Sequence, residues 1–476
     1  MADLKTKDRM KIKRKEMPLR DAEIRKNDFD EVPMGFTLED AIVEASRCID
    51  CGKPHCVEGC PVSIDIPGFL KALENGDMQK SINILMDTNQ LPAICGRVCP
   101  QDQQCELVCI VGKKNKPVSI GNLERFVADY AVKNNLIPDF TPTDAMEIDQ
   151  KIAIAGSGPA GLTVAAELRK LGYKVKIFEA LHKAGGVLFY GIPRFRLPAK
   201  VIDNEINNLK KMGVEVELNA LIGRTYTIDQ LFKDGYSAVM VGTGAGLPKM
   251  LELPGENLKG VFAANEFLTR VNLMRADKFP EFITPVIVGK DVVIIGAGNT
   301  AMDAARTAMR FKPNSVTVVY RRSREEAPAR TEEIEHAEQE GVEFLFLNNP
   351  VELIGDENYN LKEMKVVKMK LGEPDEGGRR RPIAIEGSEY NIKCDMMVSA
   401  LGFGVNPLIT STTKGIEVNK WGAIVVDDNG MTTKEGVFAA GDIITGGSTV
   451  IMAMGQAKTA AKGIDKYLKI KRGVEA

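Results

Sequence analysis

Eight of the nine cysteines of this chain lie between Cys48 and Cys109. The first four form the run "CIDCGKPHCVEGCP", with spacing C-x2-C-x4-C-x3-C-P, and the other four follow in "CGRVCPQDQQCELVC". Thiols this dense are typical of disulfide frameworks, zinc sites or iron–sulfur clusters. In each case the N-terminal region must fold around its cysteines, so this feature constrains the fold more than any other.

The spacing favours iron–sulfur clusters. Zinc sites usually pair two C-x2-C knuckles, and one such pair occurs here. Ferredoxin-type runs often close with Cys-Pro, which occurs at Cys60-Pro61 and again at Cys99-Pro100. The basic N-terminus has no apolar signal segment, so we expect a cytoplasmic protein with reduced thiols, which disfavours disulfides. Cys394 lies beside an apolar run and is expected to be a buried core thiol.

Composition excludes some broad classes of function. The formal net charge is -2 over 476 residues, which argues against a general nucleic-acid binder. The sequence has no apolar run of about 18 residues, so we expect no membrane span. Residues 1–30 are polar without a clear period, and we expect a solvated arm, or alternatively an arm laid on a partner subunit.

The secondary structure that the sequence predicts changes near residue 150. Helical spacing predicts helices at 37–47 and 119–134, with two short helices between 66 and 89 that are split at Gly76. Residues 137–150 read as a linker. From Lys151 onward, short β-branched runs alternate with helical segments, which predicts a parallel α/β fold.

The first glycine turn, "GSGPAG", follows the predicted strand "KIAIA" and opens a helix. Gly156 permits the tight turn, Gly158 lets the backbone approach a pyrophosphate, and Gly161 lets helix and strand pack closely. Glu179 closes the next strand, where a carboxylate accepts hydrogen bonds from ribose hydroxyls. Strand, helix and distal acid together predict a dinucleotide site.

A second unit of the same kind begins at "DVVIIGAGNTAMDAARTAM", with Gly296 and Gly298 in its turn. Its next strand ends in "VVYRRS", so Arg321 and Arg322 stand where the first unit has Glu179. A carboxylate there would repel a 2′-phosphate, whereas a guanidinium binds one bidentately. The second unit therefore predicts NADP(H) in preference to NAD(H). Near the C-terminus, "GVFAAGDIITGG" places a Gly-Asp pair after an apolar strand, which is weak evidence by itself.

Taken together, these motifs resemble the glutamate synthase small (beta) subunit family over nearly the whole chain, from "MPLRDAEIRKNDFDEV" to "FAAGDIITGGSTVI". The same module resembles the N-terminal half of dihydropyrimidine dehydrogenase. It is also similar to the large subunit of the electron-bifurcating, NADH-dependent reduced ferredoxin:NADP oxidoreductase.

The resemblance implies an α/β fold in which a helical iron–sulfur domain precedes two Rossmann-like domains. Residues 1–147 would hold two [4Fe–4S] clusters, residues 148–288 and 407–476 would bind FAD, and the inserted residues 289–406 would bind NADPH.

The resemblance also implies the site residues. One cluster would use Cys48, Cys51, Cys56 and Cys109, and the other Cys60, Cys99, Cys105 and Glu124, with Cys95 unligated. FAD would be held by Gly156, Gly158, Pro159, Ala160, Gly161, Glu179, Gly186, Gly441 and Asp442. NADPH would be held by Gly296, Gly298, Asn299, Thr300, Arg321 and Arg322. By sequence alone, Glu124 reads as an acid favoured in the first turn of a helix.

Three functions compete. The first is the NADPH-oxidising subunit of glutamate synthase, which would pass electrons through FAD and the clusters to a large subunit that forms L-glutamate from glutamine and 2-oxoglutarate. The second is the large subunit of the bifurcating oxidoreductase, with a ferredoxin-reductase-like flavoprotein as its partner and ferredoxin as a further electron carrier. The third is a zinc-bearing scaffold with a degenerate flavin fold. The segment "YGIPRFRLP" reads as a loop near the flavin or as a proline-bounded turn.

Overall fold

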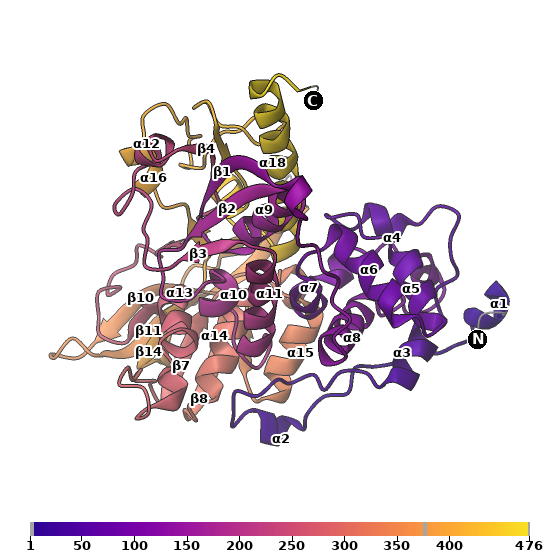
Figure 1. Cartoon of the computed structure of the whole chain (residues 1–476). Helices are drawn as coiled ribbons and strands as arrows, with labels where there is room; N and C mark the ends of the chain where they lie inside the picture. Colours follow the sequence, from indigo (N-terminus) through magenta and orange to yellow (C-terminus); the bar gives the residue numbers. More distant parts are fainter. Residues whose placement is uncertain (1–3, 375–377, 475–476) are drawn as a thin grey trace.

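The computed structural model describes residues 4–374 and 378–474, which form a helical unit and two α/β units (Figure 1). The helical unit lies to one side of both sheets, in indigo and purple. Its helices are α3 (Leu38–Ala45), α4 (His55–Glu58), α5 (Ile66–Glu74), α6 (Met78–Thr88), α7 (Pro92–Val98) and α8 (Ile120–Lys133). The predicted helices at 37–47 and 119–134 are confirmed as α3 and α8.

The break between α5 and α6 follows from local chemistry. The Asp65 carboxylate accepts a hydrogen bond from the Gly68 N–H and caps α5, and Asp77 caps α6 through the Lys80 N–H. Gly76 lies between the two helices at φ +78°, a left-handed conformation that suits glycine at a helix end. The predicted split at Gly76 is confirmed.

The first α/β unit is a five-stranded parallel sheet with strand order β16-β4-β1-β2-β3. Its strands are β1 (Ile148–Ala155), β2 (Tyr173–Phe178), β3 (Glu215–Glu217), β4 (Tyr236–Val241) and β16 (Val437–Ala439). Its helices are α9 (Pro159–Lys170), α10 (Val187–Tyr190), α11 (Ala199–Lys211), α12 (Ile228–Lys233), α16 (Leu408–Thr412), α17 (Asp442–Thr445) and α18 (Val450–Lys471).

The second unit repeats this topology with strand order β6-β14-β7-β8-β9, again all parallel. Its strands are β6 (Val261–Ala263), β7 (Asp291–Ile295), β8 (Ser315–Tyr320), β9 (Glu343–Phe346) and β14 (Met396–Ser399), and its helices are α13 (Ala264–Asn272), α14 (Asn299–Met309) and α15 (Thr331–Gln339). Because β6 pairs with β14, this unit takes in residues from before the expected boundary at 289.

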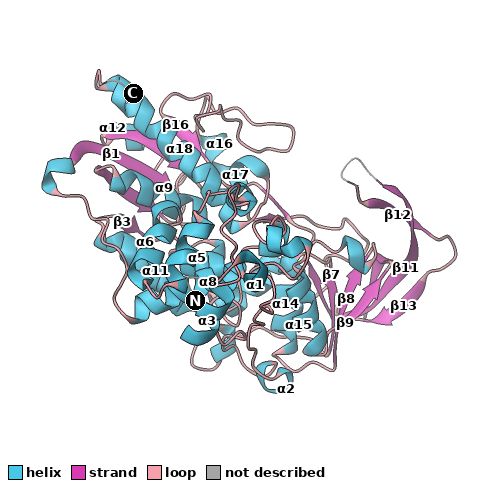
Figure 2. Cartoon of the chain, turned by 90° about the vertical axis from the view of Figure 1, so that its right-hand side faces the viewer, coloured by secondary structure: helices cyan, strands magenta, loops and turns pink. Residues whose placement is uncertain are grey.

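An antiparallel sheet extends from the second unit and projects from the body of the molecule (Figure 2). It consists of β10 (Asn348–Gly355), β11 (Leu361–Pro374), β12 (Arg380–Ala384) and β13 (Tyr390–Lys393). The two crossovers between the α/β units pair with each other as a short antiparallel ribbon of β5 (Leu247–Pro248) and β15 (Phe403–Gly404). The second unit is therefore an insertion into the first.

The helical unit and the first sheet share one hydrophobic core. A continuous cluster of buried side chains runs from Phe69 and Leu123 in the helical unit, through Ile154 and Leu162, to Met454 on α18. Burial of this apolar surface fixes the helical unit against the first sheet rather than leaving it on a tether. The cysteines are consequently held at a defined place relative to the first sheet.

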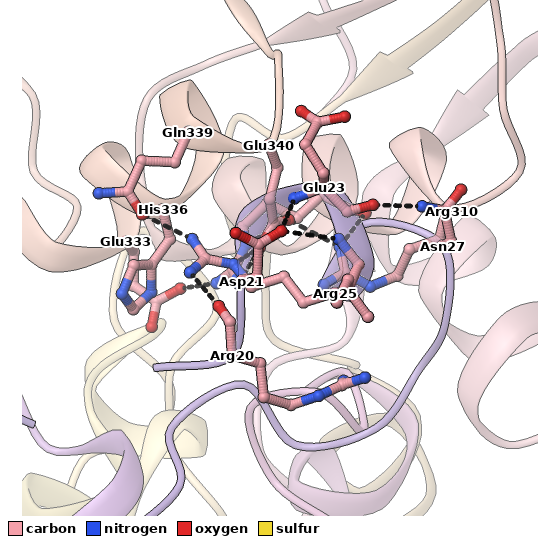
Figure 3. Close-up of polar contacts among 12 residues, drawn as sticks. Arg20, Asp21, Glu23, Arg25, Asn27, Arg310, Glu333, His336, Gln339 and Glu340 are labelled. Carbon is pink, nitrogen blue, oxygen red and sulfur yellow. Dashed lines mark hydrogen bonds and ion pairs between the residues drawn. The ribbon is translucent and has the colours of Figure 1, made fainter. Parts of the chain in front are cut away.

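The N-terminal arm, which contains α1 (Thr6–Arg9) and α2 (Ala22–Arg25), contradicts the expectation of a solvated segment. Arg9 forms an ion pair with Glu74 at 2.8 Å, and Arg25 forms one with Glu340 at 2.9 Å, both largely buried. Figure 3 shows Arg25 reaching from the arm to Gln339 and Glu340 at the end of α15. Partners distant in the chain supply these counter-charges, which polarity along the sequence does not reveal.

Candidate functional site

The cysteines gather into two groups in the structure. Cys48, Cys51, Cys56 and Cys109, here called the outer thiol group, line one cavity together with apolar side chains such as Leu70 and Val118. All four thiols of this group are partly exposed. Burial raises the pKa of Cys48 to about 11 and that of Cys56 to about 12, and the neighbouring thiols of the group add to both shifts.

The inner thiol group consists of Cys60, Cys99, Cys105 and the carboxyl of Glu124, and all four residues are buried. Burial raises the pKa of Cys60 to about 11, and Glu124 and Cys99 raise it further. Burial raises the pKa of Cys105 well above its usual value, and the charges of Glu124, Cys60 and Cys99 raise it further. The four residues of the outer thiol group line one cavity, whereas the inner residues interact with Cys95 as well as with one another. The division of the ligands into two sets of four therefore remains a prediction.

Glu124 lies in α8 beyond its first turn and is 5% exposed, so the interpretation as a first-turn helix acid is wrong. Burial raises the pKa of this carboxyl to about 8. Its Oε1 accepts a hydrogen bond of 2.6 Å from the Asn89 side chain. A carboxyl held among three thiols has a donor set that suits a shared metal cluster.

Cys95 is buried next to the inner thiol group. Its Sγ lies 3.7 Å from the Asn89 Oδ1 and 3.5 Å from the Met454 Sδ of α18. By spacing alone, Cys95 and Cys99 are equally good candidates for a cluster ligand. The contact of Cys95 with α18 is visible only in the tertiary structure.

All nine cysteines are free thiols. Among residues 4–374 and 378–474, no three His, Cys, Asp or Glu side chains are arranged to hold a single metal ion. Each thiol group nevertheless offers four donors, the number that a [4Fe–4S] cluster takes, so the residues present fit two such clusters.

The first glycine turn has the geometry of a dinucleotide cradle. Gly156 has φ +101°, and a Cβ there would lie 2.6 Å from the Gly242 carbonyl oxygen. A Cβ on Gly161 would lie 2.0 Å from the Gly156 carbonyl oxygen, so the start of α9, at Pro159 and Ala160, packs directly on the turn. At Gly158, by contrast, a Cβ would meet no atom within 4 Å, and this open space leaves room for a phosphate.

Two carboxylates flank this cradle. Glu179 accepts hydrogen bonds from the Ser157 N–H and hydroxyl and from the Leu181 N–H, which fixes it at the end of β2. Gly186 packs against the turn, since a Cβ on it would lie 2.9 Å from the Gly158 Cα.

Asp442 carries a buried Oδ1 without a hydrogen-bond partner among the described residues, and burial raises its pKa to about 6. A buried acceptor left unpaired is costly, so this atom fits a ligand hydroxyl. Gly441, just before it, donates its N–H to the Gln456 Oε1 at 2.9 Å. Tyr190 lies close by: burial raises its pKa to about 12, and the charges of Asp442 and Glu179 add to the shift.

The second glycine turn repeats the arrangement of the first. Gly296 has φ +117°, and a Cβ on Gly298 would meet its nearest atom, a Pro328 carbon, at 4.0 Å. Asn299 begins α14 and accepts a hydrogen bond from the Arg330 N–H at 3.0 Å. Thr300 follows in the first turn of α14 and is partly exposed. This cradle also has room for a phosphate.

The two arginines after β8 differ in environment. Arg321 is exposed, whereas Arg322 is 8% exposed and its Nε donates to the Arg380 carbonyl oxygen at 2.9 Å. The sequence gives the two residues the same role, because adjacent residues at a strand end cannot be ranked by burial from spacing alone.

Three consecutive residues of α18 were missed by sequence reasoning. Met454 contacts Cys95, and Gln456 contacts Gly441. Gly455 lies between them, and a Cβ there would lie 2.7 Å from the carbonyl oxygen of Pro61, the residue after Cys60. The helical pattern around "VIMAMGQAK" indicates that α18 has a buried face, but not that this face meets the cysteines.

Two family descriptions match the chain. Residues 25–136 match "Dihydroprymidine dehydrogenase domain II, 4Fe-4S cluster", and residues 149–458 match "Pyridine nucleotide-disulphide oxidoreductase". No helix within residues 4–374 and 378–474 is long and apolar enough to cross a membrane.

Relatives and solved structures agree with these matches. The NADPH glutamate synthase small chain of Azospirillum brasilense is 37% identical over 95% of this chain and 94% of its own. The NADP(+)-dependent formate dehydrogenase subunit beta of Moorella thermoacetica is 40% identical over 87% of this chain and 60% of its own.

The structure of Mycobacterium tuberculosis FprA in complex with NADPH superposes with a TM-score of 0.57 at 20% identity, covering 68% of this chain and 86% of FprA, which shows a shared fold. The Azospirillum and Moorella relatives are a small chain and a beta subunit, and they imply a partner subunit for this chain as well. The chain therefore belongs to the glutamate synthase small-chain family and is an oxidoreductase that uses NADP(H), FAD and [4Fe–4S] clusters.

Proposed function

We propose that this chain is the electron-input subunit of a cytoplasmic glutamate synthase. It takes electrons from NADPH and delivers them to a large partner subunit that forms L-glutamate from glutamine and 2-oxoglutarate. Similarity over 94% of the Azospirillum small chain supports this assignment. The free thiols suit the cytoplasm, where cysteines are kept reduced.

The observation that carries the proposal is the turn of α18 at residues 454–456. Its Met454 lies against Cys95 and its Gly455 against Pro61, both in the inner thiol group's surroundings, while Gln456 binds Gly441 beside Asp442. One helical turn thus joins the proposed flavin site to the inner thiol group. The outer thiol group is more exposed than the inner one, which supports a path in which it passes electrons to a partner.

The proposed assignments of residues follow this path. The inner cluster takes Cys60, Cys99, Cys105 and Glu124, and the outer cluster takes Cys48, Cys51, Cys56 and Cys109. The FAD site consists of Gly156, Gly158, Pro159, Ala160, Gly161, Glu179, Gly186, Gly441 and Asp442. The NADPH site consists of Gly296, Gly298, Asn299, Thr300 and Arg321, with Arg322 anchored behind it.

The protein's own contribution is orientation. A bound FAD would supply the chemistry that couples a two-electron donor such as NADPH to one-electron carriers such as iron–sulfur clusters. The two glycine turns would hold the pyrophosphates at helix N-termini, and the buried Oδ1 of Asp442 would accept a hydrogen bond from a flavin-side hydroxyl. Apolar side chains around the outer thiol group limit access of water.

Metal and flavin analysis of the anaerobically purified chain tests the cofactor assignment. We expect one FAD and about eight irons with matching sulfide per chain, and bleaching of the flavin by NADPH. Stoichiometric zinc without iron would instead identify the scaffold and contradict the proposal.

The partner is tested by isolating the native complex anaerobically from its source cells and identifying the co-purifying chain by mass spectrometry. A large subunit with glutaminase and synthase domains is expected. A small ferredoxin-reductase-like flavoprotein would instead identify the bifurcating oxidoreductase, in which ferredoxin is a further electron carrier. The formate dehydrogenase subunit from Moorella shows that related chains serve other NADP-linked enzymes.

Nucleotide preference is tested with Arg321→Ala. Loss of an exposed guanidinium at the end of β8 removes a charge-assisted hydrogen bond to the 2′-phosphate. We expect the KM for NADPH to rise about tenfold or more and the KM for NADH to change little. Equal changes for both nucleotides in steady-state ferricyanide reduction would refute NADPH binding at this strand end.

A further inference from the structure

The end of β8 is bound to a distant hairpin of the same chain. Arg322, two residues after the strand, is 8% exposed, and its Nε donates a hydrogen bond of 2.9 Å to the Arg380 carbonyl oxygen. Arg380 is the first residue of β12. The buried guanidinium of Arg322 therefore ties the β11–β12 hairpin to the strand end at which the second unit recognises a nucleotide.

This tie brings the Arg380 side chain to the same place. Its Nε donates to the Glu326 Oε1 at 2.6 Å, with 46% of the Arg380 side chain exposed and 9% of the Glu326 side chain. The other carboxylate oxygen of Glu326 accepts hydrogen bonds from the Ser323 N–H at 3.1 Å and from the Ser323 hydroxyl at 2.6 Å. The Glu326 carboxylate thus lies between Arg380 and Ser323, the residue that follows Arg322, and the exposed Glu325 carboxylate also contacts the Ser323 hydroxyl.

The charges of Glu326 and Arg380 affect how an anion can bind near the end of β8. The 2′-phosphate of NADPH is an anion, and Glu326 at the strand end would repel it. Arg380 offsets the Glu326 charge and still presents a half-exposed guanidinium, whose planar fork binds phosphate oxygens well. Arg321 is exposed on the adjacent backbone. Two cations from different parts of the chain, Arg321 and Arg380, therefore lie in the segment that follows β8 or in contact with it.

We propose that Arg380 is a specificity-determining residue for NADPH, which binds the 2′-phosphate together with Arg321 while Arg322 holds the hairpin in place. This inference rests on the proposed NADPH site. It assigns a function to the projecting hairpin of Figure 2, which brings a cation to the nucleotide from 58 residues beyond Arg322.

The test compares NADPH and NADH as electron donors to ferricyanide with the anaerobic holoenzyme. Arg380→Ala should lower the ratio of kcat/KM for NADPH to kcat/KM for NADH by about tenfold. Arg380→Lys, which keeps the charge but loses the planar fork, should restore part of the ratio.

Arg381→Ala is the matched control. It removes the same charge from the next residue of β12, where successive side chains point to opposite faces of the strand. We expect this variant to keep the wild-type ratio, since alternation along β12 should direct the Arg381 side chain to the face opposite that of Arg380.

Three outcomes overturn the inference. If Arg380→Ala lowers kcat/KM equally for both nucleotides, the residue serves the fold and not selectivity. If Arg321→Ala lowers the ratio but Arg380→Ala does not, the NADPH site stands and Arg380 lies outside it. If Arg321→Ala also leaves the ratio unchanged, the proposed NADPH site itself is wrong.

Discussion

At the scale of single residues, burial changes what a carboxyl group does. Glu124 and Asp442 are ordinary acids in the sequence, yet burial raises the pKa of the first to about 8 and of the second to about 6. Each belongs to a proposed cofactor site, and the Oδ1 of Asp442 has no hydrogen-bond partner among the described residues. Perturbed acids of this kind mark functional sites when geometry agrees, as it does for both.

Glu124→Ala tests the proposed cluster ligand. It removes one of four donors from the inner thiol group and leaves the outer thiol group intact, so one [4Fe–4S] EPR signal should change while the other persists. Glu205→Gln is the matched control, since Glu205 is also a buried acid, and it accepts its hydrogen bond from the Ala93 N–H. Two unchanged cluster signals in Glu124→Ala would remove Glu124 from the ligand set.

Asp442 predicts a pH dependence of FAD binding. Its folded pKa, about 6, is raised from 3.8 by burial, so ionisation costs stability without FAD as the pH rises from about 4 to about 6. FAD offsets this cost, because the ionised carboxylate accepts the stronger hydrogen bond. The dissociation constant for FAD should therefore fall about tenfold as the pH rises from 5 to 7. It is measured from the fluorescence of flavin released on dilution of the holoenzyme. Asp442→Asn should show no such slope, and a slope in this variant would assign the titration to another group.

At the scale of elements, the segment at residues 190–198 joins two sites. It begins at Tyr190, near Asp442, and continues to Phe195, whose ring lies 3.7 Å from the Arg310 guanidinium. Arg196 then binds both oxygens of Asp303 at 2.7 and 2.8 Å, in the second turn of α14. Its two sequence interpretations, a loop near the flavin and a proline-bounded turn, both omit this link between the α/β units.

Arg196→Ala should be strongly destabilising. Removal of one partner leaves Asp303 buried and uncompensated, which costs about 3–5 kcal/mol. Arg194→Ala, in the same segment, loses a hydrogen bond to the Asn272 carbonyl and should cost about 1 kcal/mol. Thermal unfolding followed by circular dichroism compares the two variants. The double variant Arg196→Ala with Asp303→Ala should be less destabilised than the sum of the single variants, and simple additivity would exclude the coupling.

At the scale of the whole molecule, the N-terminal arm connects the helical unit to the second α/β unit. Arg9 binds Glu74 in the helical unit, and Arg25 reaches Glu340, 315 residues away, where Arg306 and Arg310 also converge. The arm therefore runs across the molecule and is held at both places by buried charge (Figures 1 and 3).

Arg25→Ala should loosen this connection. Glu340 keeps Arg306 and Arg310 as partners, so the loss of the Arg25 hydrogen bond should cost about 1.5–3 kcal/mol of stability. Arg20→Ala breaks the more exposed Arg20–Asp28 pair and should cost less than about 1 kcal/mol. Hydrogen exchange should accelerate in α2 and at the end of α15 in Arg25→Ala alone. Equal exchange in the two variants would show that the arm is held by other contacts.

The sequence alone determined the local features of this protein. The two strand–glycine–helix units, the split at Gly76 and the dense thiols follow from short-range backbone geometry and from spacing, so each is legible in a few consecutive residues. The resemblance of these motifs to a family then supplied the grouping of the cysteines, which spacing left open at Cys95. The family and its cofactors were predicted in this way.

Only the tertiary structure decided how distant residues meet. The buried arm, the unpaired Oδ1 of Asp442, the different environments of Arg321 and Arg322 and the approach of α18 to Pro61 all depend on partners far away in the chain. The start of the second sheet at β6 was missed for the same reason, since strand pairing is a long-range contact. Burial and counter-charge are properties of packing, and packing sets the chemistry of each of these side chains.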